Sequence, residues 1–275
     1  MPKGIALYKL LSKDQLIDLY HQEKTLDGIS RITGFDPQAL HSLMRRYDIP
    51  FKYKTKYTHD DSAFSKDTEE SFYWAGFIAA DGCIKEKNKN TKILSIGLAI
   101  KDKQHLVKFK DFLSADEPVS SYNDNSCEFH IVSNEIAKDL FRFNITPRKS
   151  KTYTFPEIVK NHNLAPHFLR GYFDGDGGLS FYTDTKRGRK IAQAIISIRG
   201  TYEFLEAFRE KITNIPMGKN KIRLSNGTHI LSYGGNINAQ KMFQYLYGNS
   251  SIYLDRKFNL VKQYLDIDPT KIKLK

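Results

Sequence analysis

Two segments of matching pattern, one in each half of the chain, constrain the fold more than any other feature of the sequence. The first is "WAGFIAADGC" at residues 74–83, and the second is "LRGYFDGDGG" at residues 169–178. Each ends a helical pattern in an aspartate followed by glycine. Aligned on that Asp-Gly pair, the segments match at Gly76 and Gly171, at Ala80 and Gly175, and at Asp81 and Asp176.

Glycines inside these two helices need a structural reason. Each costs about 1 kcal/mol relative to alanine. Small residues four positions apart let a second helix approach closely. We therefore expect the two helices to pack against each other through the face formed by Gly76, Ala80, Gly171 and Gly175. The aspartates that end both helices then lie close together.

The paired aspartates indicate a metal site. A helix carboxyl terminus carries partial negative charge, so two carboxylates meeting there repel each other. A shared divalent cation relieves both, and carboxylates that leave sites for water and phosphate suit Mg²⁺, with Mn²⁺ as a substitute. Such a pair is typical of phosphodiester hydrolysis. The alternative is that each Asp-Gly only ends its helix in a turn.

An EF-hand and a histidine-based nuclease are both disfavoured. In an EF-hand starting at "DGDGG", Gly178 and Leu179 would stand where that loop needs a ligand and a glycine. "NHN" at residues 161–163 has no second His or Cys set to support it and is interpreted as a linker.

The composition favours a partner with many negative charges. The formal net charge is +12 and the pI is about 9.4, with Lys and Arg spread over the whole length. Aromatics reach 13%, many beside basic residues. This is typical of an ordered protein that binds nucleic acid. The alternative is a basic soluble protein without such a partner.

Cysteine usage and hydropathy bound the compartment. Cys83 and Cys127 form neither a CxxC pair nor a zinc pattern. No run of residues fits a signal peptide or a transmembrane span. We therefore expect a soluble cytoplasmic protein without membrane contact, from a bacterial or phage-infected cell.

A repeat organises the chain after residue 70. Residues 71–162 and residues 163–275 each follow the order helix, two strands, helix, two strands, helix. Strand pairs separated by single helices indicate an α+β fold of two pseudo-symmetric αββαββα halves, each with a four-stranded antiparallel sheet. Residues 51–70 lack either periodicity and are interpreted as a linker that can lie along a phosphate backbone.

Each sheet is predicted to have one apolar and one polar face. Alternating residues at 94–101 and 190–199 place helices under one face and leave the other suited to DNA. The basic hairpin tips at 85–90 and 185–190 suit phosphate contact, although each tip alone is an ordinary solvated turn. The candidate DNA-binding residues are Lys85, Lys87, Lys101, Lys186, Arg187, Arg189, Gln193 and Arg199.

Residues 1–50 are predicted to form a small all-α domain of three helices. The last two, joined by a turn that contains Gly34, match a helix-turn-helix. The third would read a DNA groove through the polar residues Gln38, His41, Ser42, Arg45 and Arg46. The alternatives are a plain three-helix bundle and a protein-binding module.

The segments at residues 74–82 and 169–177 resemble the paired motifs of the LAGLIDADG homing endonucleases. The resemblance covers roughly residues 71–265. It implies a monomer whose two sheets form a saddle over a long site in double-stranded DNA, with each half cutting one strand to give a staggered break. The family's metal-binding acids fall on Asp81 and Asp176, and the metal site takes in the preceding Ala80 and Gly175.

Members of this family also tend to carry a basic residue near the end of each half, close to the scissile phosphate. "TPRKS" and "YLDRKF" occupy those places, which makes Lys149 and Lys257 the candidates. They would stabilise charge at the phosphate or polarise the attacking water; the alternative is simple contact with the DNA backbone. The motif's earlier acid is Asp174 in one half and Ala79 in the other. That position is usually a cap or helix-contact residue and not the metal ligand, so we expect altered packing and retained activity.

The resemblance therefore predicts a site-specific, Mg²⁺-dependent homing endonuclease, intron-encoded or free-standing. The alternative is a non-cleaving nucleic-acid-binding protein on the same scaffold, either an RNA maturase for intron splicing or a transcriptional regulator. An intein is disfavoured, because the chain has neither the Cys or Ser start nor the His-Asn end of self-splicing.

Overall fold

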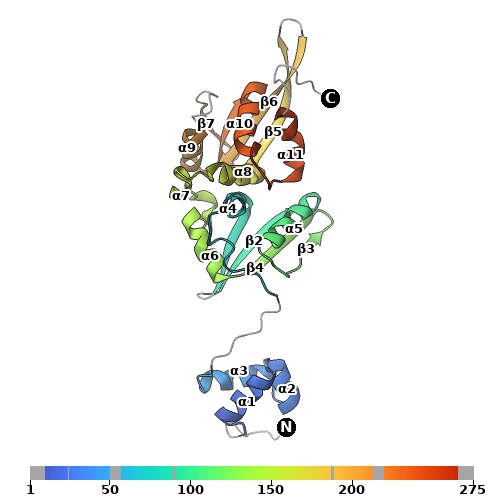
Figure 1. Cartoon of the computed structure of the whole chain (residues 1–275), viewed down its shortest axis with the longest axis vertical. Coiled ribbons are helices and arrows are strands. Elements are labelled where there is room, and N and C mark those ends of the chain that lie inside the picture. Colours follow the sequence, from blue (N-terminus) through green and yellow to red (C-terminus); the bar gives the residue numbers. More distant parts are fainter. Residues whose placement is uncertain are drawn as a thin grey trace. The chain divides into compact units, whose positions relative to one another are not determined.

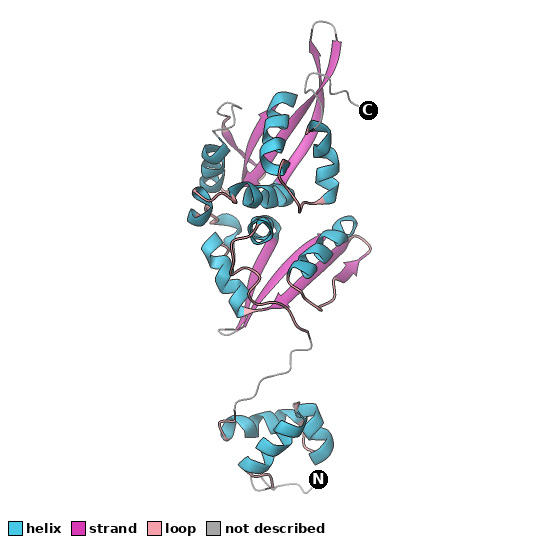
Figure 2. Ribbon diagram, in the orientation of Figure 1, coloured by secondary structure: helices cyan, strands magenta, loops and turns pink. Residues whose placement is uncertain are grey.

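The computed structural model describes residues 10–23, 25–49, 57–88, 91–186, 189–212 and 220–265. The chain divides into two compact units, residues 1–57 and residues 58–275, and each is described by itself (Figures 1 and 2). Among the helices within these ranges, none is both long and apolar enough to cross a bilayer.

The first unit is a three-helix domain with its own core. Its helices are α1 (Lys13–Glu23), α2 (Leu26–Thr33) and α3 (Pro37–Arg46). Asp36 caps α3 by accepting hydrogen bonds from the backbone N–H groups of Gln38 and Ala39. Leu16, Ile29 and Leu40, one from each helix, are fully buried. The three predicted helices are confirmed.

The second unit begins with a sheet that helices cover on one face. Its elements are α4 (Glu69–Asp81), β1 (Gly82–Asn88), β2 (Thr91–Ala99), α5 (Lys103–Phe112), β3 (Ser120–Asn123), β4 (Ser126–Val132) and α6 (Asn134–Leu140). The strand order is β1-β2-β4-β3, antiparallel throughout. α5 packs on β2 and β4, and α6 packs on β2.

The rest of the second unit repeats this plan. Its elements are the short α7 (Glu157–Lys160), α8 (Ala165–Asp176), β5 (Gly177–Lys186), β6 (Arg189–Gly200), α9 (Tyr202–Lys211), β7 (Ile222–Ser225), β8 (Thr228–Gly234), α10 (Asn236–Tyr247) and α11 (Asp255–Val261). The strand order is β5-β6-β8-β7, equivalent to that of the first sheet. The predicted repeat is confirmed. The sequence analysis did not assign α7 and α11, which are too short for a clear periodic pattern.

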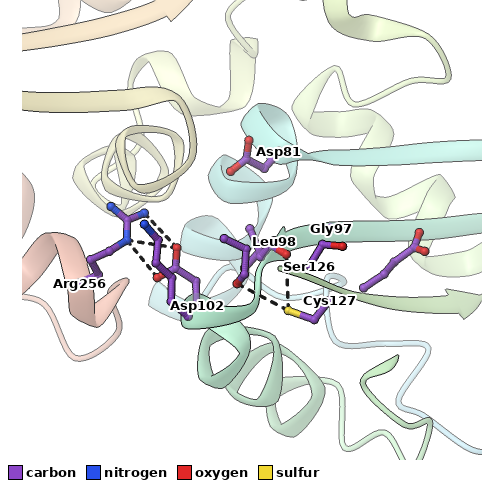
Figure 3. A pocket seen from close by; sticks show the side chains of 10 residues that line it. Asp81, Gly97, Leu98, Asp102, Ser126, Cys127 and Arg256 are labelled. Carbon is purple, nitrogen blue, oxygen red and sulfur yellow. Dashed lines mark hydrogen bonds and ion pairs between the residues drawn. The ribbon is translucent and has the colours of Figure 1, made fainter. Parts of the chain in front are cut away.

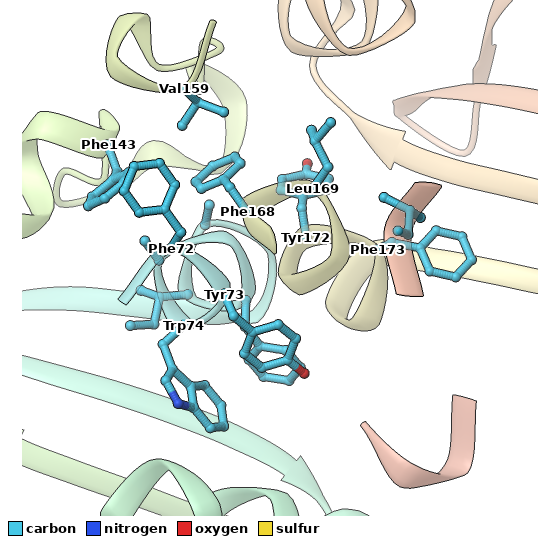
Figure 4. Packing of buried hydrophobic residues seen from close by; sticks show 14 of the residues in the cluster. Phe72, Tyr73, Trp74, Phe143, Val159, Phe168, Leu169, Tyr172 and Phe173 are labelled. Carbon is cyan, nitrogen blue, oxygen red and sulfur yellow. The ribbon is translucent and has the colours of Figure 1, made fainter. Parts of the chain in front are cut away.

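The paired helices α4 and α8 lie side by side between the two sheets (Figure 1). Aromatic residues join the halves around them (Figure 4). The ring of Phe143 lies 5.1 Å from that of Phe72 on α4 and 6.0 Å from that of Phe168 on α8, measured between ring centroids. One hydrophobic core therefore runs through both halves, and it fixes where the two helices end.

The segment before α4 is packed, in contrast to the linker predicted over residues 51–70. Phe64 is fully buried, and the N–H of Asp60 donates to the carbonyl of Leu113 at 2.7 Å. Arg142 pairs with Asp67 at 2.7 Å. From residue 58 onward this stretch therefore belongs to the folded unit, while residues 51–56 lie outside the described ranges. Tertiary contacts order it, and these leave no periodic trace in the sequence.

Candidate active site

The glycine face of each helix contacts the backbone of the other helix, as predicted. A Cβ added at Gly76 would overlap the carbonyl oxygen of Phe168 on α8, and one added at Gly171 would overlap the carbonyl oxygen of Tyr73 on α4. Near the carboxyl-terminal ends, a Cβ on Gly175 would overlap the Cβ of Ala80. Only glycine permits this approach.

This packing brings the two aspartates into electrostatic contact. A Cβ on Gly175 of α8 would lie 3.3 Å from Oδ2 of Asp81 on α4. The pKa of Asp81 is raised to about 6, mainly by desolvation of its carboxylate and next by the negative charge of Asp176. Burial also raises the pKa of Asp176, against the lowering effect of nearby positive charges. The pKa of each acid is thus raised despite the nearby positive charges, and a bound cation would stabilise both carboxylates further.

Two lysines, Lys149 buried and Lys257 partly buried, approach the same helix ends. Lys149 donates to the carbonyl oxygen of Gly82 at 2.8 Å, and Lys257 donates to that of Gly177, the two glycines that follow the aspartates. Lys257 also donates to the carbonyl oxygens of Phe173 at 2.7 Å and Gly175 at 3.1 Å. The lysines therefore occupy equivalent places in the two halves, although their spacings from the aspartates differ in sequence.

The lysine charges act on the aspartates. Lys149 and Lys257 each lower the pKa of both acids. Burial in turn lowers the pKa of Lys149, and it lowers that of Lys257 to about 8. A lysine amine with a depressed pKa beside a carboxylate pair is an arrangement typical of functional sites.

A hollow of about 580 Å³ opens beside Asp81 on the first sheet (Figure 3). Gly97, Ala99 and Glu128 line it from the strands. At its edge the guanidinium group of Arg256 on α11 donates hydrogen bonds to both carboxylate oxygens of Asp102, at 2.9 to 3.2 Å. This ion pair joins the two halves next to the site, and the sequence analysis did not find it.

Comparison of whole chains identifies the fold. No family model matches this chain, and no curated protein matches it in sequence. Solved structures do match. The LAGLIDADG meganuclease I-AabMI, bound to uncleaved DNA, is 12% identical with a TM-score of 0.53, over 70% of this chain and 88% of that one. The homing endonuclease I-LtrWI, bound to target DNA, is 14% identical with a TM-score of 0.52, over 74% and 92%. This chain has the LAGLIDADG fold.

The earlier acid of the second LAGLIDADG motif is a buried helix contact. Asp174 of α8 accepts hydrogen bonds from the hydroxyl groups of Tyr73 at 2.8 Å and Tyr247 at 2.6 Å, and from the N–H of Leu254 at 2.8 Å. Its counterpart Ala79 is also buried, but its methyl side chain has no atom that could accept a hydrogen bond. The two halves therefore pack differently at this position, as expected.

The open faces of the LAGLIDADG sheets carry four of the eight residues that were predicted to bind DNA in this unit. Lys85, Lys87 and Arg199 are exposed and Gln193 is partly exposed. The positive charge of Arg199 lowers the pKa of Asp176, so this face adjoins the site. Lys101 was predicted on a strand, but β2 ends at Ala99 and Lys101 lies in a 3₁₀ turn, where it lines the hollow.

Part of the predicted contact surface at the second hairpin tip falls outside the described residues. Arg187 lies outside the described residues, as do the side chains of Lys186 and Arg189.

Arg223 was not predicted, yet it is exposed on β7, opposite Ile230, which in turn pairs with Arg199. Strand alternation over residues 222–225 was the signal that could have revealed it.

The five predicted groove-reading residues of the first unit all lie on α3. Gln38, Ser42, Arg45 and Arg46 are exposed, and His41 is partly exposed. Elsewhere, the predicted linker residue His162 packs on the ring of Phe72 at 4.5 Å. It is thus part of the core boundary.

Proposed function

We propose that this protein is a site-specific DNA endonuclease that makes a staggered double-strand break, acting as a monomer. The observation that supports this most is the pair Asp81 and Asp176. The acids end two helices packed through glycine, each next to a lysine bound to the following carbonyl. Both halves of such a site come from one chain, so no second copy is needed.

The residues fit a divalent cation. Asp81 and Asp176 present carboxylate oxygens, with the backbone of Ala80 and Gly175 beside them, and their mutual repulsion is the kind that a bound cation relieves. Within the described residues, no three His, Cys, Asp or Glu side chains form a metal-binding group. Remaining positions would therefore fall to water and to the DNA phosphates. Mg²⁺, or Mn²⁺ in its place, would activate water and stabilise the leaving oxygen.

The chain's own residues orient the reacting groups. The glycine contacts fix the separation of the two aspartates. Lys149 and Lys257 are held by hydrogen bonds to backbone carbonyls, close enough to lower the pKa of Asp176. Their positive charges would offset the negative charge that develops at the phosphates. Arg199 and Arg223 on the open face would contact the DNA backbone.

A second candidate function is binding without cleavage, as an RNA maturase or a regulator. It is favoured by the strongly basic chain alone, since binding requires no acids. The retained acid pair favours the nuclease, because two repelling carboxylates have no use in a protein that only binds a polyanion.

Cleavage can be tested with a plasmid library that carries randomised inserts, incubated with protein and Mg²⁺. Linear products are sequenced at their ends. We expect one recurring site with staggered ends, Mn²⁺ to substitute, and Asp176→Asn or Asp81→Asn to abolish the double-strand break. Asp124→Asn, in an exposed turn, is the matched control and should cut normally. Tight binding of one sequence with neither metal producing a cut would favour the second candidate.

A further inference from the structure

The first unit has a backbone geometry that the proposed nuclease site does not explain. α2 has eight residues and ends at Gly34, whose φ of +70° lies in the left-handed region. The chain then turns within residues 34–36, and Asp36 and Pro37 start α3. A short helix, a tight turn with a left-handed glycine and a second capped helix form a helix-turn-helix.

One face of α3 is buried and the other is polar. Leu40, Leu43 and Met44 pack in the core of the unit. Gln38, Ser42, Arg45 and Arg46 are exposed, and the spacing of the first three aligns them along one side of the helix. A protein-docking face would be expected to present an apolar anchor, whereas the only apolar exposed residue within α3 is Ala39.

The balance of charge in the first unit differs between α3 and α1. α3 has two arginines and no acidic residue. Asp14, Asp18 and Glu23 lie instead on α1. A long-range attraction to phosphate therefore favours approach by α3 and disfavours approach by α1. Amide and guanidinium groups along one helix face are also the side chains that form paired hydrogen bonds with adenine and guanine in the major groove.

We infer that α3 binds the major groove of duplex DNA beside the stretch bound by the nuclease unit, so that the target has two separate blocks. This inference deepens the proposed function and rests on it for the first block only. Between residues 49 and 57 the extended chain spans at most about 28 Å, or about eight base pairs of duplex. This tether, together with the size of the two units, limits how far the second block can lie from the first.

The blocks can be mapped by selecting duplexes from a library with a randomised centre, using the full-length Asp81→Asn/Asp176→Asn protein so that no DNA is cut. We expect two conserved blocks. Gln38→Ala/Arg45→Ala in that background should erase the flanking block, leave the other unchanged, and weaken binding to the selected duplex at least about fivefold. On a duplex with the flanking block scrambled, the loss should disappear. Retained binding to that scrambled duplex shows that the variant is folded.

Lys13→Ala is the matched control, because it removes one positive charge from the exposed face of α1 in the same unit. It should preserve both blocks. A single block, or equal loss from Lys13→Ala and Arg45→Ala, would overturn the inference. So would a Gln38→Ala/Arg45→Ala protein that binds the duplex normally but loses binding to a structured RNA. Failure of the cleavage test leaves this mapping intact, since it measures only binding.

Discussion

The hydroxyl of Tyr73 on α4 donates a hydrogen bond of 2.8 Å to the carboxylate of Asp174 on α8, across the interface between the two halves. Both side chains are buried. The hydroxyl of Tyr247 and the backbone N–H of Leu254 also donate hydrogen bonds to this carboxylate. A buried carboxylate is stable only when hydrogen-bond donors surround it. The packing of α4 against α8 therefore supplies a donor that Asp174 needs, two residues before Asp176.

Removing the Tyr73 hydroxyl should destabilise the second unit. Tyr73→Phe keeps the ring but takes one of three donors from Asp174, which we expect to lower the free energy of unfolding by about 1–3 kcal/mol. Urea denaturation of the full chain measures it. Tyr182→Phe removes a hydroxyl from an exposed residue and should change stability by less than about 0.5 kcal/mol. Equal effects would contradict the role assigned to the network.

Adding a methyl group between the paired helices should be costly. Gly76→Ala places a Cβ into the carbonyl of Phe168, and overpacking against a backbone costs about 1–3 kcal/mol. In Gly97→Ala the added Cβ would lie 4.0 Å from its nearest neighbour, the carbonyl oxygen of Cys127, at an exposed position of β2, so that variant should be as stable as the parent. The midpoints of urea unfolding compare the two. A tolerated Gly76→Ala would mean that the helices are not held at this distance.

Loss of the Lys257 amine should reduce cleavage more than stability. Burial lowers its pKa to about 8, so Lys257→Met removes a desolvated charge together with its hydrogen bonds, and these two changes have opposite effects on the free energy of unfolding. Cleavage at the site should fall by about 10²-fold or more, as for other groups that stabilise developing charge. Lys262→Met, at an exposed position, should cut normally. A large loss of stability with normal cleavage would make Lys257 a purely structural residue.

Acid should destabilise the protein through His105. Burial, with smaller contributions from the charges of Lys108 and Lys257, lowers the pKa of His105 to about 3. The Tyr73 hydroxyl donates its one hydrogen bond to Asp174. Its oxygen therefore accepts a hydrogen bond from Nε2–H of His105 at 3.0 Å, and the imidazole is neutral. The unfolded chain takes up a proton near pH 6.5, whereas the folded chain does so only near pH 3.

The stability that the neutral His105 contributes is therefore complete above pH 6.5 and is lost as the pH falls toward 3, by up to about 1.4 kcal/mol per pH unit. His105→Gln removes this titration, so its unfolding free energy should depend less steeply on pH between 6.5 and 4. Urea denaturation over this range provides the slopes. Parallel slopes for the two proteins would rule out the histidine as the source.

The local pattern of the chain was sufficient to predict the longer helices, the paired strands and their repetition. Glycine spacing and apolar alternation act between near neighbours, and these interactions determine which face of an element is buried. The glycine pairs at positions 76 and 171 follow directly, because a helical glycine is favourable only where another backbone replaces its side chain. The aspartates of the site follow from their places at the ends of those helices.

Other features depended on contacts between residues far apart in sequence. The burial of Phe64, the ion pair of Asp102 with Arg256, and the convergence of His105, Tyr73 and Asp174 join segments whose separation no local pattern encodes. The family resemblance had already paired Lys149 with Lys257, and the tertiary structure added the contact of each amine with the carbonyl that follows an aspartate. The sequence by itself determined which residues form helices and which acids end them. Only the tertiary structure decided which distant charges and hydroxyl groups surround those acids, because burial and electrostatic interaction depend on distance in space.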